Sequence, residues 1–206
     1  FEMVNDGIEH QSEIVSHDLI GKYKASGNLP MAPFDQLLIN QYQHDIKPLI
    51  GRTLYLTGES LKQVNVELSF AHPLHELQTI QLVGRIDDVG TKGLVNYRPG
   101  GANGNDLVRV YLRHLCLNAM GYNKPSYLLD IGHFHSFAPL TPMQAKNQLS
   151  VWLAYFLQGQ AQPLPFMAKT SLAYTEADGE HSEKLLQARA VWLDENTDIG
   201  EGQNPH

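Results

Sequence analysis

The sequence lacks several features that would place it in a large class of proteins. Among its 206 residues there is one cysteine, Cys116, so no internal disulfide can form. The sequence also shows no signal peptide and no apolar run of membrane-spanning length. These absences argue against a disulfide-stabilised secreted domain and against a transmembrane helix, and they favour a reducing, cytoplasmic location.

Positive charge is also scarce. Fifteen basic residues stand against twenty-two acidic ones, which gives a net charge of −7 and an isoelectric point of about 5.8. Autonomous nucleic-acid binders are usually basic, because neutralising phosphates and releasing counterions drives their affinity. We therefore expect DNA to contact at most a local patch, with Arg85, Arg98, Arg109 and Arg113 as candidates. The simpler alternative is that these arginines are solvated or form structural ion pairs.

Common catalytic signatures are missing. There is no H-E-x-x-H pair and no G-x-S-x-G elbow, and Cys116 has no persuasive catalytic partner. The glycine-rich stretch 100–104 is not followed by Gly-Lys-Ser/Thr, so it predicts a plain turn rather than a phosphate-binding loop. His133 and His135 have a spacing that zinc can use, but no histidine cluster or second cysteine lies near them in sequence. We expect ordinary strand histidines and no metal site.

The central part of the chain has the patterns of an α/β protein. Residues 64–70 and 80–86 alternate between apolar and polar side chains, as half-buried strands do. Residues 94–97 form a third short strand, and residues 127–131 a fourth. Between them, a helix is predicted to begin near Asn105 or Asp106 and to end at Gly121, a residue type that favours helix C-caps. This succession predicts a mixed central sheet flanked by helices.

Both flanks of this central part are predicted to be helical. Apolar residues recur at helical spacing within 14–23 and 37–50. Thr141, Pro142 and Gln144 form a capping box with proline at the first helical position, and we expect the apolar stripe behind it to be core: Leu149, Trp152, Leu153, Phe156 and Leu157. A last helix covers 185–193. The polar, acidic tail 194–206 is expected to be poorly ordered.

The most informative segment is 84–88, followed after a short turn by 95–98. Metal-dependent nucleases of the restriction-enzyme type place one aspartate on a strand, then an acid and a lysine as D-x-K on the next strand. The two carboxylates bind Mg²⁺, and the lysine lies beside the attacking water. Here Asp87 occupies the first position, but Asn96 replaces the second acid and Arg98 replaces the lysine. The layout is that of a nuclease without the groups that would make it active.

Each replacement has a chemical consequence. Asn96 keeps a carbonyl oxygen but loses the negative charge on which Mg²⁺ sites depend. Arg98 stays cationic, and it cannot exchange a proton as a tuned lysine can. Asp88 is adjacent to Asp87, and because neighbouring strand residues face opposite sides of a sheet, we expect that it cannot simply replace the lost acid. Ordinary hairpin residues remain the alternative for this pattern.

Several phrases, in their order along the chain, resemble one family. They are Gly27-Asn28-Leu29-Pro30, Gly84-Arg85-Ile86, Tyr97-Arg98-Pro99, Leu112-Arg113-His114-Leu115, Phe137-Ala138-Pro139-Leu140-Thr141 and Leu186-Gln187-Ala188-Arg189. Together they resemble the C-terminal region of the gamma subunit of bacterial exodeoxyribonuclease V, the RecC family. The resemblance spans nearly the entire chain.

The resemblance implies a restriction-endonuclease-like, PD-(D/E)XK fold with a degenerate active site. Related nucleases also carry a histidine in the helix before the sheet, where this chain offers only His44. The implied role is a non-catalytic module of an ATP-dependent helicase–nuclease that acts in double-strand-break repair and recombination. Its implied partners are the beta (RecB) and alpha (RecD) subunits, and DNA within the complex. Mg²⁺ and ATP would be used by the other subunits, so no cofactor is expected here.

A chain of 206 residues can bury one sizeable core, so we expect a single nuclease-like domain cut from a longer protein that continues past His206. Its parts would be a helical entry (1–50), a sheet core with one helix (51–136), C-terminal helices (137–193) and the polar tail. The alternative function is an active Mg²⁺-dependent nuclease that recruits Asp88 or Glu67. For a protein interface, the candidate anchors are Tyr155, Tyr174 and Trp192.

Overall fold

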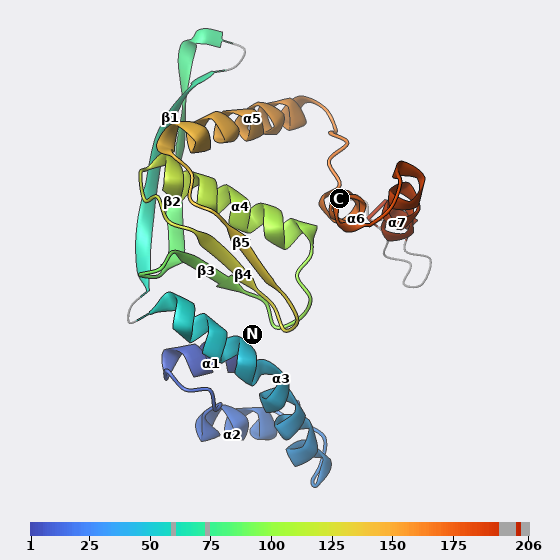
Figure 1. The fold of residues 1–206 in the computed structure, drawn as a ribbon. Helices are drawn as coiled ribbons and strands as arrows, with labels where there is room; N and C mark the ends of the chain where they lie inside the picture. Colours follow the sequence, from blue (N-terminus) through green and yellow to red (C-terminus); the bar gives the residue numbers. More distant parts are fainter. Residues whose placement is uncertain (59–60, 73–74, 194–200, 203–206) are drawn as a thin grey trace.

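The computed structural model describes residues 1–58, 61–72, 75–193 and 201–202, with the backbone alone for residues 75–77. Within these residues, three helices lead into a five-stranded sheet interrupted by one helix, and three more helices follow (Figure 1). The helices are α1 (Glu2–Glu9), α2 (His17–Ala25), α3 (Phe34–Thr57), α4 (Gly104–Ala119), α5 (Pro142–Ala161), α6 (Ala168–Glu176) and α7 (His181–Leu193). The strands are β1 (Lys62–His72), β2 (His75–Val89), β3 (Leu94–Tyr97), β4 (Ser126–Leu129) and β5 (Phe134–Phe137).

The sheet confirms the predicted mixed α/β class. Its strand order is β1-β2-β3-β4-β5, and neighbouring strands are antiparallel except β3 and β4, which are parallel. A parallel pair needs a long crossover connection, and α4 supplies it. β2 and β3 share one paired position, Val89 with Leu94, so the long β1–β2 hairpin diverges from the other strands. This arrangement is compatible with the restriction-endonuclease-like fold that the resemblance implies.

A β-bulge interrupts the hairpin close to the segment that resembles a nuclease site. Val64 pairs with Ile86, and Lys62 pairs with Val89, so Asp87 and Asp88 together lie opposite Gln63. Asp88 has a φ of 64°, in the left-handed region that aspartate tolerates better than most residues. The bulge lets both Ile86 and Val89 enter the same apolar cluster, although strict alternation would place them on opposite faces.

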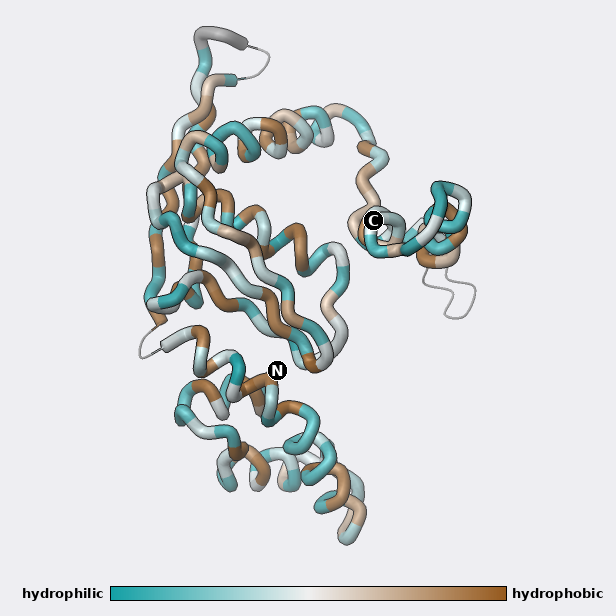
Figure 2. The backbone as a smooth tube through the Cα atoms, viewed as in Figure 1, coloured by the Kyte–Doolittle hydropathy of each residue, from teal (hydrophilic) through white to brown (hydrophobic). Residues whose placement is uncertain are grey.

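Two apolar clusters lie on opposite faces of the sheet, because consecutive strand residues enter different clusters. Leu94 and Leu128 pack with α4 and α5, whereas Val95 and Leu129 pack with α1 and α3. Apolar positions recur along the helices and strands that surround the clusters (Figure 2). Leu115 of α4 is fully buried, and removing such a side chain to alanine typically costs about 2–5 kcal/mol. The helices therefore hold β3 and β4 firmly between them.

The predicted helix starts at α4 and α5 are confirmed. Asn103 and Asp106 form a capping box at α4, and Thr141 and Gln144 form another at α5. Gly121, just past the end of α4, has a φ of 89°, as a C-cap glycine should.

The prediction that the α5 stripe is core is only partly right. Leu149 is buried, and Trp152, Leu153 and Leu157 are half-buried, but Phe156 is 62% exposed. The physical reason is that α5 packs mainly against α4, so the side of the helix that carries Phe156 stays open to solvent.

The terminal regions hold elements that the sequence did not reveal. α1 and α6 were not predicted, and α3 extends to Thr57, past the expected end of the helical entry at residue 50. The predicted disorder of the tail concerns residues that lie mostly outside those described. Glu201 is described, and its carboxylate accepts the backbone N–H groups of Lys169 (3.1 Å) and Thr170 (2.7 Å) at the start of α6. Among the described residues, no helix is both long and apolar enough to cross a membrane.

Candidate functional site

Asp87, the one expected metal ligand that the sequence retains, lies on the outer face of the β1–β2 hairpin. Its Oδ1 is 3.2 Å from Nε of Arg85, which lies two residues earlier on the same face of β2. Both side chains are about half exposed, at 48% and 59%. The carboxylate is therefore open to solvent and is balanced by a neighbouring guanidinium, and it forms no hydrogen bond or ion pair with Asn96 or Arg98.

Asn96 faces α4 rather than Asp87. Nη1 of Arg113 donates a hydrogen bond of 3.1 Å to Oδ1 of Asn96. That oxygen is the atom that remains from the carboxylate expected at this position. The oxygen of Asn96 that could bind a metal ion is thus already bonded to a guanidinium.

Arg98 links the end of β3 to the beginning of α4. Its guanidinium forms a short ion pair with Asp106, and its backbone N–H donates to the carbonyl oxygen of Leu129 at 2.8 Å. Asp106 also accepts the backbone N–H of Asn103 in the capping box. The arginine that replaces the expected lysine therefore fixes a helix start, which is the structural alternative considered for it.

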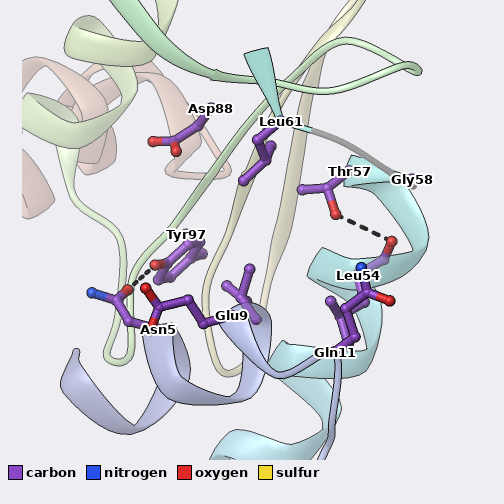
Figure 3. A pocket seen from close by; sticks show the side chains of 10 residues that line it. Asn5, Glu9, Gln11, Leu54, Thr57, Gly58, Leu61, Asp88 and Tyr97 are labelled. Carbon is purple, nitrogen blue, oxygen red and sulfur yellow. Dashed lines mark hydrogen bonds between the residues drawn. The ribbon is translucent and has the colours of Figure 1, made fainter. Parts of the chain in front are cut away.

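Asp88, the second residue of the bulge, lines a pocket of about 440 Å³ between α1, α3 and β2–β3 (Figure 3). The described residues that line this pocket are Asn5, Ile8, Glu9, Gln11, Leu54, Thr57, Gly58, Leu61, Asp88 and Tyr97. Burial is the main reason that the pKa of Asp88 is raised, and the charge of Asp87 adds to it, while the charge of Arg113 acts in the opposite direction. Tyr97, whose hydroxyl contacts Asn5, also has a raised pKa because of burial and of Asp88.

The carboxylates considered as replacements do not converge. Glu67 pairs with Val83 on the exposed outer face of the hairpin, whereas Asp88 faces the pocket. Glu67 lies four residues along β1 from Gln63, the position opposite the bulge, which corresponds to about 13 Å along a strand. Among the residues that the structure describes, no group of three or more His, Cys, Asp and Glu side chains could hold a metal ion.

The other candidates for metal binding also have ordinary surroundings. The rings of His133 and His135 lie 6.3 Å apart, and Nδ1 of His133 is 3.3 Å from Oδ2 of Asp130. His44 is exposed in the middle of α3, far from the end of the helix that approaches the sheet. Burial raises the pKa of the Cys116 thiol to about 11, so the thiol is protonated and weakly nucleophilic.

Three of the four arginines proposed for DNA contact have polar partners within the chain. Arg85 pairs with Asp87, Arg98 with Asp106, and Arg113 bonds Asn96. Arg109 is exposed on α4, between Asp106 and Arg113 along the helix, and none of the described residues forms an ion pair with it. Three of these arginines therefore have structural roles, and Arg109 is the one without an ion pair among the described residues.

Asp130 is an important residue that the sequence analysis missed. It is almost completely buried at the end of β4, where its carboxylate accepts the backbone N–H groups of Ala102 (2.8 Å), Gly132 (2.8 Å) and His133. Its carbonyl oxygen accepts a hydrogen bond of 2.8 Å from Arg52 of α3. An aspartate directly after an apolar strand and two residues before a glycine was the available signal. The residue ties the loop before α4 to the β4–β5 turn.

Comparison with known proteins agrees with the resemblance stated from the sequence. The family described as "RecC C-terminal domain" matches residues 2–179. The chain belongs to this family. It is also similar to the RecBCD enzyme subunit RecC of Buchnera aphidicola subsp. Schizaphis graminum, at 24% identity over 148 residues. The match covers 71% of this chain and 13% of that relative, so the chain corresponds to a small part of the relative's length.

Proposed function

We propose that this chain is a non-catalytic, nuclease-like module of the gamma subunit of an ATP-dependent helicase–nuclease, exodeoxyribonuclease V. The observation that carries the proposal is the separation of the expected ligands. Asp87 pairs with Arg85 on the outer face of the hairpin, and Asn96 of β3 is bonded to Arg113 of α4. Membership of the RecC C-terminal domain family supports the assignment to this subunit.

The guanidinium of Arg113, which is bonded to Asn96, opposes metal binding at this position. Mg²⁺ needs negatively charged oxygen ligands in near-octahedral geometry, and it gives up its water reluctantly. The neutral amide of Asn96 offers one oxygen, which already accepts a hydrogen bond from Arg113. A divalent ion placed there would meet a positive charge at close range and gain little in return. In this proposal the module uses no metal or nucleotide of its own, and Mg²⁺ and ATP serve other subunits.

The alternative is an active Mg²⁺-dependent nuclease with a migrated carboxylate. It would need Asp88 or Glu67 to join Asp87, and the structure gives these three side chains different surroundings. A direct test incubates the purified protein with linear duplex and single-stranded DNA in Mg²⁺ or Mn²⁺. We expect no degradation above that of an Asp87→Ala variant. Degradation that disappears in this variant would refute the proposal.

The proposed role in assembly is supported by exposed apolar side chains on α5. Val151 and Tyr155 are four residues apart, so they are neighbours on one helix face, and they are 56% and 55% exposed. Met143, in the first turn of the helix, is 71% exposed. Of the suggested anchors, Tyr174 and Trp192 are half-buried, which leaves Tyr155 as the exposed one. An acidic protein gains little from phosphate contacts, whereas exposed aliphatic and aromatic groups can bind another protein. We propose that this face contacts the alpha subunit of the complex.

Co-purification of the full-length gamma subunit with the alpha and beta subunits tests the role in assembly. A Val151→Asp, Tyr155→Asp double variant should lower recovery of the alpha subunit severalfold, because it places two charges in an apolar contact. An Asn96→Asp, Arg98→Lys variant is the control and should leave recovery unchanged, since neither residue lies on α5 and a lysine can keep the ion pair with Asp106. Equal recovery of the alpha subunit with all three proteins would exclude the α5 face.

A further inference from the structure

A second pocket, distinct from the acidic one beside Asp88, is lined by basic and aromatic side chains. It has a volume of about 230 Å³ and lies between the start of β1, the β2–β3 turn and the loop after α4. The described residues that line it are Lys62, Gln63, Val64, Val89, Gly90, Thr91, Tyr122 and Lys124, and none of these is acidic. Although the chain has a net charge of −7, the charged side chains among these described lining residues are both basic.

Both lysines keep donors that could bind an anion. Nζ of Lys124 donates one hydrogen bond, to the carbonyl oxygen of Thr91 at 2.9 Å, and an ammonium group has three donors. Lys62 is exposed, and no described residue forms an ion pair or side-chain hydrogen bond with it. The bond holds the Lys124 ammonium beside Thr91, another lining residue of the pocket, and Lys62 supplies a second positive charge to the same lining. Two ammonium groups in the lining of one pocket favour the binding of phosphate oxygens.

The remaining lining groups point to a polymer rather than to a free small molecule. Pockets that enclose whole small-molecule ligands usually measure about 300–1,000 Å³, more than this one. Tyr122 is 40% exposed at the rim, so part of its ring is open to an incoming base. Proteins that bind single strands combine a positive groove for the backbone with aromatic rings on which bases stack.

We propose that the pocket formed by Lys62, Tyr122 and Lys124 binds single-stranded nucleic acid, with the lysines on a phosphodiester and a base on the tyrosine. The proposal gives the proposed module a defined contact with DNA, and it does not depend on whether the Asp87 region is catalytically inactive. It also differs from the four arginines considered first, three of which are engaged within the chain.

Fluorescence anisotropy with a labelled oligothymidylate of about ten nucleotides at low salt tests the proposal. A Lys62→Gln, Lys124→Gln variant should bind about tenfold or more weakly, and its slope of log affinity against log salt should fall by about 1.4, at about 0.7 per lysine. The matched control is Lys22→Gln, Lys146→Gln, which removes the same charge from exposed sites on α2 and α5. The control should bind as the unchanged protein does.

Substitution of Tyr122 distinguishes the binding of nucleic acid from the binding of a simple anion. Tyr122→Leu should weaken binding about tenfold without changing the salt slope, because stacking contributes affinity and no counterion release. Tyr42→Leu, at a tyrosine of α3 that is 45% exposed, is its control. Three results would each overturn the proposal: no binding by the unchanged protein, equal weakening by both lysine pairs, or unchanged affinity in Tyr122→Leu. Nuclease activity is measured separately, so its presence or absence leaves this test intact.

Discussion

At the scale of single residues, Asp88 and Asp130 show opposite outcomes for a buried carboxylate. Asp88 lies in a pocket whose described lining residues include no basic group, and burial together with Asp87 raises its pKa despite the charge of Arg113. Burial also opposes ionisation of Asp130, but the N–H groups of Ala102, His133 and Gly132 outweigh it and hold the pKa below its usual range. Ionised Asp88 therefore lowers the stability of the folded protein, whereas ionised Asp130 raises it.

Replacing Asp88 by asparagine should stabilise the protein at neutral pH. A carboxyl whose pKa is raised by folding binds more protons in the folded state, so its contribution to stability falls as pH rises through the window between the two pKa values. Asparagine tolerates the positive φ and carries no charge. Urea unfolding should show a gain in the free energy of unfolding at about pH 7, and a smaller gain at about pH 4. A loss of stability at neutral pH would contradict this.

Replacing Asp130 by alanine should destabilise the protein by about 2–4 kcal/mol at neutral pH, because three backbone donors lose their buried acceptor. Folding lowers the pKa of Asp130, so its carboxylate stabilises the folded protein fully at pH values above its pKa in the unfolded chain. This stabilisation is lost as the pH falls through its pKa in the folded protein. The destabilisation measured by urea unfolding should therefore shrink in acid. Asp178→Ala, at an exposed position, is the control and should have little effect.

At the scale of helices and strands, local chemistry predicted some elements well and missed others. The four-residue strand β3 and the starts of α4 and α5 were predicted because glycines, capping residues and alternation mark them. α1 and α6 have no side-chain cap, and they are short, so little in the sequence marks them. The bulge at Asp87 and Asp88 depends on packing of Val89 into the core, which the alternating pattern alone could not show.

Gly104→Ala tests how α4 is fitted against α6. A Cβ at Gly104 would lie 2.1 Å from the carbonyl oxygen of Ala168, so the backbone of α6 would have to move. We expect a loss of about 1–3 kcal/mol in the free energy of unfolding. Gly21→Ala in α2 is the matched control, since its Cβ would meet no atom within 4 Å, and it should stabilise the helix by up to about 1 kcal/mol. Similar effects of the two substitutions on urea unfolding would contradict the tight fit.

At the scale of the whole molecule, the sequence predicted the mixed α/β class, and the RecC resemblance is confirmed by the family match over residues 2–179. The surroundings of the candidate site could not be predicted. Sequence spacing placed Asp87, Asn96 and Arg98 in nuclease order. Arg85, the partner of Asp87, lies two residues earlier on the same strand, but the pairing of Asn96 with Arg113 and of Arg98 with Asp106 depends on how α4 packs against β3. We further propose that residues 1–206 form one domain of the gamma subunit.

The most direct test of the central claim is whether the degenerate site binds a divalent cation. Electron paramagnetic resonance of free Mn²⁺ reports binding without relying on DNA cleavage. We predict that the purified protein leaves the signal of free Mn²⁺ unchanged at millimolar concentrations, and that Asn96→Asp leaves it unchanged as well, because the new carboxylate would pair with Arg113. One equivalent of bound Mn²⁺ in the unchanged protein, lost in Asp87→Ala or Asp88→Ala, would contradict the account.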